Sequence, residues 1–192
     1  MQTDSFSFLC RTKTGFGRHA LSHLPFDLAA MGAGKPFVIQ DARSHKAGSG
    51  KPLIQAFRDS GMTLGFCPPF QADTTTDMET VKSWHKAFTD GGFDAVITLG
   101  TGRAADLAKA LNLAVSLGPE TLKNGIPDAA PPLMPSAFLP TGVGTGFETG
   151  CTARFEEKRF DHPLLAPDIA VVDPVLMTSE KTGRISDAAL TS

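Results

Sequence analysis

The chain has 192 residues, of which 41% are hydrophobic and 20% are charged, and its formal net charge is −2. This composition excludes a disordered chain, and the near-neutral charge argues against a general nucleic-acid-binding protein, which needs a basic surface. No apolar run reaches the roughly 18 residues of a membrane span, and the first ten residues lack a secretory signal. The 3 cysteines are widely spaced and form no metal pattern, so we expect reduced, buried thiols. These features predict a single-domain cytoplasmic protein that contacts neither nucleic acid nor membrane.

Short apolar runs alternate with longer amphipathic segments along the first half of the chain. The predicted elements are a strand at 37–40, a helix at 52–61, a strand at 62–67 and a helix that begins at 76–79 and ends at 91–92. Pro52 suits the first turn of the second element, and Gly61 suits its end. Thr76 and Glu79 form a capping box, which predicts the start of the second helix.

The second half continues this alternation, with glycines directly after two of its strands. The predicted elements are a buried strand at 94–99, a helix at 103–113 and strands at 137–139, 151–155 and 169–172. Strand–helix alternation predicts an α/β fold with a doubly wound, mostly parallel, Rossmann-like sheet that has helices on both faces. Ligands of such sheets bind at the carboxyl ends of the strands, where this sequence places its glycine loops.

Three glycine-rich segments are candidates for a phosphate-binding loop, because glycine lets the backbone approach an anion closely. Residues 48–51 resemble the end of a P-loop, but Pro52 replaces the Ser or Thr that binds magnesium, and residues 32–34 precede a strand. Residues 100–102 follow a strand and open a helix, and a second Gly/Thr loop at 141–146 follows another strand. This pair favours a nucleotide site. Asp41, after the first strand, either accepts hydrogen bonds from a ribose diol or is a helix N-cap or turn residue.

Four segments together resemble the iron-containing alcohol dehydrogenase family, which belongs to the wider dehydroquinate-synthase-like group. They are 16–17 (FG), 94–109 (DAVITLGTGRAADLAK), 139–148 (LPTGVGTGFE) and 167–174 (PDIAVVDP). The resemblance covers the N-terminal half of such enzymes. It implies an NAD(P)-dependent oxidoreductase that also holds iron or zinc.

By this resemblance, seven residues would bind the dinucleotide. Gly100, Thr101 and Gly102 would contact the pyrophosphate, and Asp41 would hold the adenine ribose. The residues on the nicotinamide side would be Thr141, Gly142 and Thr145. A carboxylate at position 41 favours NAD over NADP, because it repels a 2′-phosphate. Asp106 and Lys109 are interpreted as helix residues of the motif, with Asp106 close to the cofactor.

The sequence also departs from the family pattern. The family's three glycines and serine are here Gly-Thr-Gly-Arg, with Arg103 either pairing with a phosphate or blocking it, and Gly142 and Phe147 replace two hydroxyl residues. Asp187 resembles the first metal ligand, but Thr191 stands where a histidine is expected.

We therefore expect a dinucleotide-binding domain at 1–177 and the start of a helical metal-binding domain at 178–192. Iron or zinc would require the rest of that second domain. His19 and His23, four residues apart and so on one helix face, are not accompanied by a carboxylate at ligand spacing. No catalytic residue is assigned.

Three functions follow from the resemblance. The first is the NAD(P)-binding half of an iron-type alcohol dehydrogenase, inactive alone. The complete enzyme would transfer a hydride between an alcohol or aldehyde and a nicotinamide cofactor. The second is a non-catalytic nucleotide-binding or regulatory relative, and the third is a fragment of a dehydroquinate-synthase-like lyase. A half-enzyme would expose an apolar face, which a second chain or a homodimer would cover.

Overall fold

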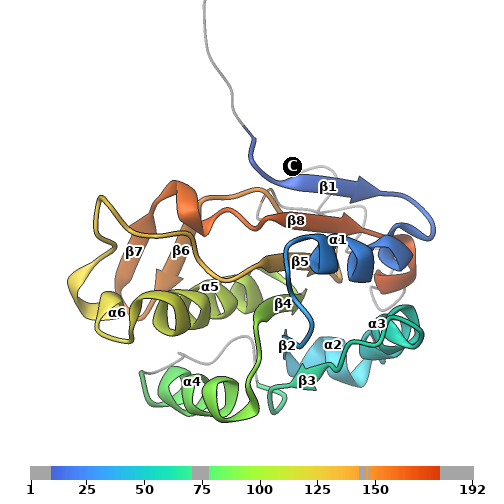
Figure 1. Ribbon diagram of the computed structural model, residues 1–192, viewed down its shortest axis with the longest axis horizontal. Helices are drawn as coiled ribbons and strands as arrows, with labels where there is room; N and C mark the ends of the chain where they lie inside the picture. Colours follow the sequence, from blue (N-terminus) through green and yellow to red (C-terminus); the bar gives the residue numbers. More distant parts are fainter. Residues whose placement is uncertain (1–9, 71–77, 143–145, 147, 178–192) are drawn as a thin grey trace, which may run out of the picture.

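A six-stranded, wholly parallel sheet forms the centre of the computed structural model, which describes residues 10–70, 78–142, 146 and 148–177 (Figure 1). Its strand order is β1-β8-β5-β4-β2-β3. The strands are β1 (Lys13–Phe16), β2 (Pro36–Gln40), β3 (Gly65–Phe66), β4 (Ala95–Gly100), β5 (Ser136–Pro140) and β8 (Ile169–Val172). The predicted α/β class and parallel sheet are confirmed.

Helices cover both faces of this sheet. They are η1 (Ala20–His23), α1 (Leu24–Ala30), α2 (Ala42–Lys46), α3 (Gly50–Phe57), α4 (Met78–Gly91), α5 (Gly102–Leu117), α6 (Thr121–Asn124), η2 (Pro163–Leu165) and η3 (Pro174–Leu176). Alternate side chains of a strand point to opposite faces. Ile97 and Leu99 of β4 therefore pack with η1, α1 and α3, whereas Val96 packs with α4 and α5.

The middle of the sheet is fully buried, which explains why its sequence is mostly apolar, with Gln40 and Thr98 as the polar exceptions. Every residue of β2 and β4 is buried, as expected for parallel strands covered on both sides. Val38 pairs with Ile97, and Thr98 pairs with Phe138, so β4 lies between β2 and β5. The ends of these three strands therefore meet at one edge of the sheet.

The structure differs from the sequence prediction between β2 and α4. The helix expected at 52–61 is α3, which begins at Gly50 and ends at Phe57, and α2 lies before it, where no helix was predicted. The predicted strand at 62–67 is only two residues long, because little of it pairs with β2. Glu79 lies in the first turn of α4, but its predicted capping partner Thr76 lies outside the described residues. The strand β1 was not predicted.

A small antiparallel hairpin lies beside α5, apart from the main sheet (Figure 1). It consists of β6 (Thr152–Phe155) and β7 (Lys158–Asp161). The predicted strand at 151–155 is confirmed, but the sequence did not indicate its partner. Phe155 and Phe160 are buried against α5 and α6, so the hairpin extends the core on this face.

Candidate functional site

Gly100 ends β4 at the carboxyl edge of the sheet and leads through Thr101 into α5. A Cβ atom at position 100 would lie 2.6 Å from Oδ2 of Asp41 and 2.9 Å from Cβ of Ala104. Such distances are too short for any residue with a side chain, so the strand-to-helix turn requires glycine here. Thr101 is the N-cap of the 16-residue helix α5, and its side chain makes no capping hydrogen bond. The first turn of a helix directs N–H groups outward, which suits a bound anion.

Asp41 is the N-cap of α2, one of the two alternatives that the sequence left open. Its Oδ1 accepts a hydrogen bond from the backbone N–H of Ser44 at 2.7 Å, and the side chain is only 1% exposed. The carboxylate lies against Gly100, the first residue of the glycine loop at 100–102. The structure thus brings Asp41 and Gly100 together, and a role of Asp41 in binding ribose stays a prediction.

Thr141 follows β5 directly and lies on the other side of β4. Its N–H donates to the carbonyl oxygen of Gly100 at 3.1 Å, and its hydroxyl is 2.9 Å from that of Ser44. Gly142 is also buried at this edge. Thr145 lies outside the described residues. Six of the seven predicted cofactor residues are therefore described, and all six lie at or directly after the carboxyl ends of β2, β4 or β5.

Two charged residues of α5, Asp106 and Lys109, attach the hairpin to the helix. The Lys109 Nζ donates to the carbonyl oxygens of Gly150 and Thr152 at 2.7 and 2.8 Å. Asp106 Oδ1 accepts from the backbone N–H of Arg154 at 2.9 Å. Burial lowers the pKa of Lys109 and raises the pKa of Asp106. Asp106 thus binds the hairpin backbone, and together the two residues hold the end of the connection that starts at Thr141.

Arg103, for which the sequence left open whether it pairs with a phosphate or blocks its site, points to the hairpin. Its Nη1 donates to the carbonyl oxygen of Arg154 at 3.4 Å. This bond connects the start of α5 to β6 of the hairpin.

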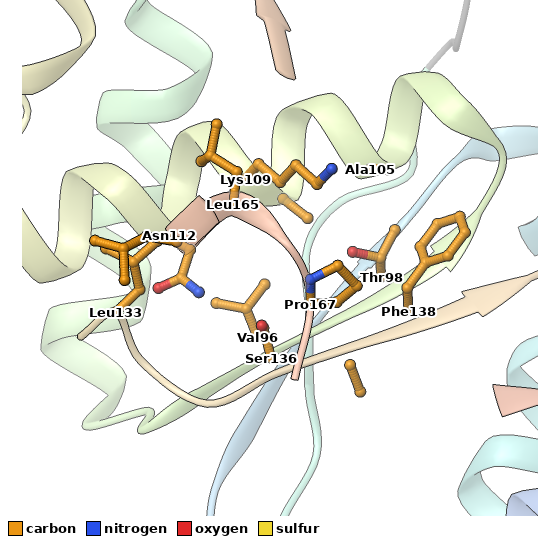
Figure 2. Close-up of a pocket in the computed structure, with 13 residues that line it drawn as sticks. Val96, Thr98, Ala105, Lys109, Asn112, Leu133, Ser136, Phe138, Leu165 and Pro167 are labelled. Atoms are coloured by element: carbon orange, nitrogen blue, oxygen red, sulfur yellow. The ribbon is translucent and has the colours of Figure 1, made fainter. Parts of the chain in front are cut away.

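Two hollows differ in their suitability for a ligand. Figure 2 shows a cavity between α5 and the sheet, with Asn112 on one side and Val96 and Ser136 on the other. Its volume of about 20 Å³ corresponds to one water molecule, so it cannot hold a nucleotide ring. A larger cleft of about 940 Å³ opens at the carboxyl ends of β1 and β8, where Arg18 and Lys51 contribute positive charge. That cleft lies on the same edge of the sheet as Gly100 and Thr141.

Within the described part of the chain, no three His, Cys, Asp or Glu side chains are grouped so that they could hold a metal ion. The predicted ligand Asp187 lies outside the described residues. His19 has φ +68° and precedes η1, so it does not share a helix face with His23 as expected. The described residues do not fit a metal site, and we derive no reaction step through a metal.

The cysteines are free, as predicted, but only one of them is buried. Cys67 is buried, Cys10 is exposed and Cys151 is half-buried. Burial raises the pKa of Cys67 to about 11. In the described residues, no helix is long and apolar enough to cross a membrane.

The parallel sheet, the glycine turn into α5 and the polar residues at its carboxyl edge are typical of a nucleotide-binding α/β domain. A family model, "Iron-containing alcohol dehydrogenase", matches residues 11–174. The chain belongs to the iron-containing alcohol dehydrogenase family, as the sequence motifs indicated.

Known relatives agree with this assignment. The chain is 27% identical over 174 residues to "NAD-dependent methanol dehydrogenase" of Bacillus methanolicus, and this alignment covers 87% of this chain and 45% of that protein. It is 31% identical over 178 residues to "Probable alcohol dehydrogenase EutG" of Salmonella typhimurium, which covers 88% of this chain and 44% of that protein. The chain thus spans about half the length of the curated relatives it matches.

Solved structures show the same fold. The crystal structure of a 1,3-propanediol oxidoreductase has a TM-score of 0.82 at 20% identity, covering 96% of this chain and 50% of that chain. The sulfoacetaldehyde reductase of Bifidobacterium kashiwanohense in complex with NAD+ has a TM-score of 0.79 at 20% identity, covering 98% and 51%. Each resembles this chain over about half of its own length.

Sequence reasoning missed Ser44 and the attachment of the hairpin by Asp106 and Lys109. Their partners lie 41 to 97 residues away in the chain, so no local pattern could indicate the contacts. The one available signal for Ser44 was its position three residues after Asp41, which is the spacing of an N-cap hydrogen bond.

Proposed function

We propose that this chain is the dinucleotide-binding half of an iron-type alcohol dehydrogenase. The observation that carries the proposal is the turn at Gly100, where a Cβ would collide with Asp41 and Ala104. The chain therefore requires glycine at the turn directly before the N-terminus of α5, the end of a helix that favours a bound phosphate. The fold family and the NAD+ complex of a structural relative support a nicotinamide dinucleotide as the ligand.

The residues at the ends of the three central strands are proposed to contact different parts of the dinucleotide. Gly100, Thr101 and Gly102 bind the pyrophosphate, Asp41 faces the adenine ribose, and Thr141, Gly142 and Thr145 line the nicotinamide side. The nicotinamide ring, when bound, accepts or donates a hydride at its C4 atom. A carboxylate at position 41 makes NAD the preferred ligand over NADP.

Turnover requires the remainder of the enzyme. The matched relatives are about twice as long as this chain, and the described residues offer no metal site. We therefore assign 1–177 to the dinucleotide domain, 178–192 to the start of the metal-binding domain with Asp187 as a ligand, and no catalytic residue to this chain. Iron or zinc would act only with that second half present.

Exposed apolar side chains support a covering partner, either a second chain or a homodimer. Phe16 and Phe26 are 81% and 73% exposed, and Val175, next to the last described residues, is 44% exposed. Burial of side chains of this size from water favours association. A clean monomer in sedimentation that also fails to bind an apolar dye would contradict this part of the proposal.

Titration calorimetry with NADH, NADPH and ADP-ribose tests the dinucleotide site. We expect NADH to bind more tightly than NADPH. ADP-ribose should bind as well, because it contains the adenine ribose and the pyrophosphate that Asp41 and residues 100–102 are proposed to contact. Asp41→Ala should abolish this preference and weaken binding. Asp41→Asn is the matched control, because asparagine preserves the N-cap and removes only the charge. It should narrow the difference between NADH and NADPH while leaving α2 intact.

A non-catalytic nucleotide-binding relative is the second candidate. It is favoured by the enclosure of Asp41, which is 1% exposed. Binding of NADH that persists in the complete protein without any oxidation of alcohols would support this candidate. Failure of every ligand to bind at millimolar concentration would refute both.

A further inference from the structure

A hydrogen bond between two buried hydroxyl groups spans the carboxyl end of β4. The Oγ of Ser44, in α2, lies 2.9 Å from Oγ1 of Thr141, which follows β5. Ser44 is 1% exposed and Thr141 is 4% exposed. Because β4 lies between β2 and β5 in the sheet, this bond connects the residues that follow β2 and β5 across the end of β4.

The same cluster encloses the carboxylate of Asp41. Its Oδ1 accepts the N–H of Ser44 at 2.7 Å, and its Oδ2 lies against Gly100. A ribose hydroxyl must come within roughly 3 Å of a carboxylate oxygen to form a hydrogen bond. Asp41 is 1% exposed in this arrangement, in which Ser44 and Thr141 are joined, so a ribose hydroxyl reaches it only after its surroundings move.

We propose that Ser44 is a further positioning residue of the dinucleotide site: its hydroxyl holds Thr141 across the end of β4 in the free chain and releases it when the ribose binds Asp41. The inference rests on the proposed function. A ligand that binds only the open arrangement has its apparent affinity reduced by the fraction of molecules that are open. Loss of the Ser44 hydroxyl raises that fraction and therefore tightens binding.

The test compares Ser44→Ala and Ser44→Cys with the wild-type chain in titrations with ADP-ribose. Both variants remove or weaken one neutral hydrogen bond, so we expect affinity to rise about two- to tenfold. Ser60→Ala is the control, because the Ser60 hydroxyl bonds the carbonyl of Phe57 in the connection from α3 to β3. It should leave the affinity unchanged. Urea unfolding of each variant verifies that the chain still folds.

Inorganic pyrophosphate separates this role from a general loosening of the domain. It occupies the glycine turn but carries no ribose, so its affinity should be the same in wild type and Ser44→Ala. An equal gain for pyrophosphate would overturn the assignment of the bridge to the ribose.

Two further results would also be decisive. If wild type binds ADP-ribose and Ser44→Ala binds it equally or more weakly, the role of Ser44 is overturned and the dinucleotide site stands. If neither wild type nor any variant binds ADP-ribose, the dinucleotide site itself is refuted, and the role of Ser44 with it.

Discussion

Replacing Gly100 by alanine is the sharpest test of the glycine turn. The added methyl group would lie 2.6 Å from Asp41 Oδ2 and 2.9 Å from Ala104 Cβ, distances that real Cβ atoms do not tolerate. Asp41 is held by its bond to Ser44, and Ala104 belongs to the first turn of α5, so neither can move without disturbing a helix start. We expect overpacking to lower the free energy of unfolding by about 1–3 kcal/mol. Urea denaturation measures this loss.

Gly15→Ala provides the matched control. A Cβ there would lie 3.8 Å from Ala20 Cβ and 3.9 Å from the carbonyl oxygen of Ala170, which is ordinary contact. Because alanine also loses less backbone entropy than glycine in a strand, stability should stay the same or rise by up to about 1 kcal/mol. Equal stability of Gly100→Ala and wild type would refute the steric argument, and with it the reason for glycine at this turn.

Three further predictions concern buried ionisable groups. Lys109→Met leaves two hairpin carbonyl oxygens without their charged donor and should lower the free energy of unfolding, measured with urea, by about 2–3 kcal/mol. An unchanged unfolding midpoint would contradict the role of Lys109 in attaching the hairpin to α5. Because burial raises the pKa of Asp106 above its ordinary 3.8, the folded chain binds that proton more readily than the unfolded chain. As the pH falls from about 7 to about 4, the free energy of unfolding of wild type should therefore rise relative to that of Asp106→Asn. A relative fall would contradict this prediction. With a pKa of about 11, Cys67 should react with a thiol reagent only after unfolding, whereas Cys10 and Cys151 react in the folded chain; one common rate for all three would contradict its burial.

The buried centre of the fold could be predicted from the sequence because burial on both faces leaves a local signal. The apolar residues of β4 and the Gly-Thr-Gly that follows them indicated both the strand and the turn into α5. The edge strand β1 leaves no such signal: three of its four residues are exposed, and its sequence is KTGF. Its position depends on pairing with β8, which lies far along the chain.

The candidate site was predictable residue by residue, but its internal contacts were not. The sequence indicated that Asp41, Gly100 and Thr141 follow three strands, and parallel pairing brings them to one edge. It left open whether Asp41 is an N-cap, because that depends on the short helix α2, which was not predicted. The hydrogen bond between the hydroxyl groups of Ser44 and Thr141 depends on where α2 packs relative to the end of β5. No local sequence pattern determines the distance between these two oxygen atoms.

The order of strands in the sheet has a consequence for synthesis on the ribosome. β1 is made first, yet its sheet partner β8 is separated from it by more than 150 residues, with Lys13 opposite Ile169. The amino-terminal strand must therefore wait, unpaired, until nearly the whole domain has been translated, while β2, β4 and β5 can already associate. Long waits of this kind slow folding and expose strand edges to other chains. A nascent chain stalled before residue 169 should consequently hold a four-stranded sheet with a free edge at β5, where a chaperone or a second nascent chain could bind.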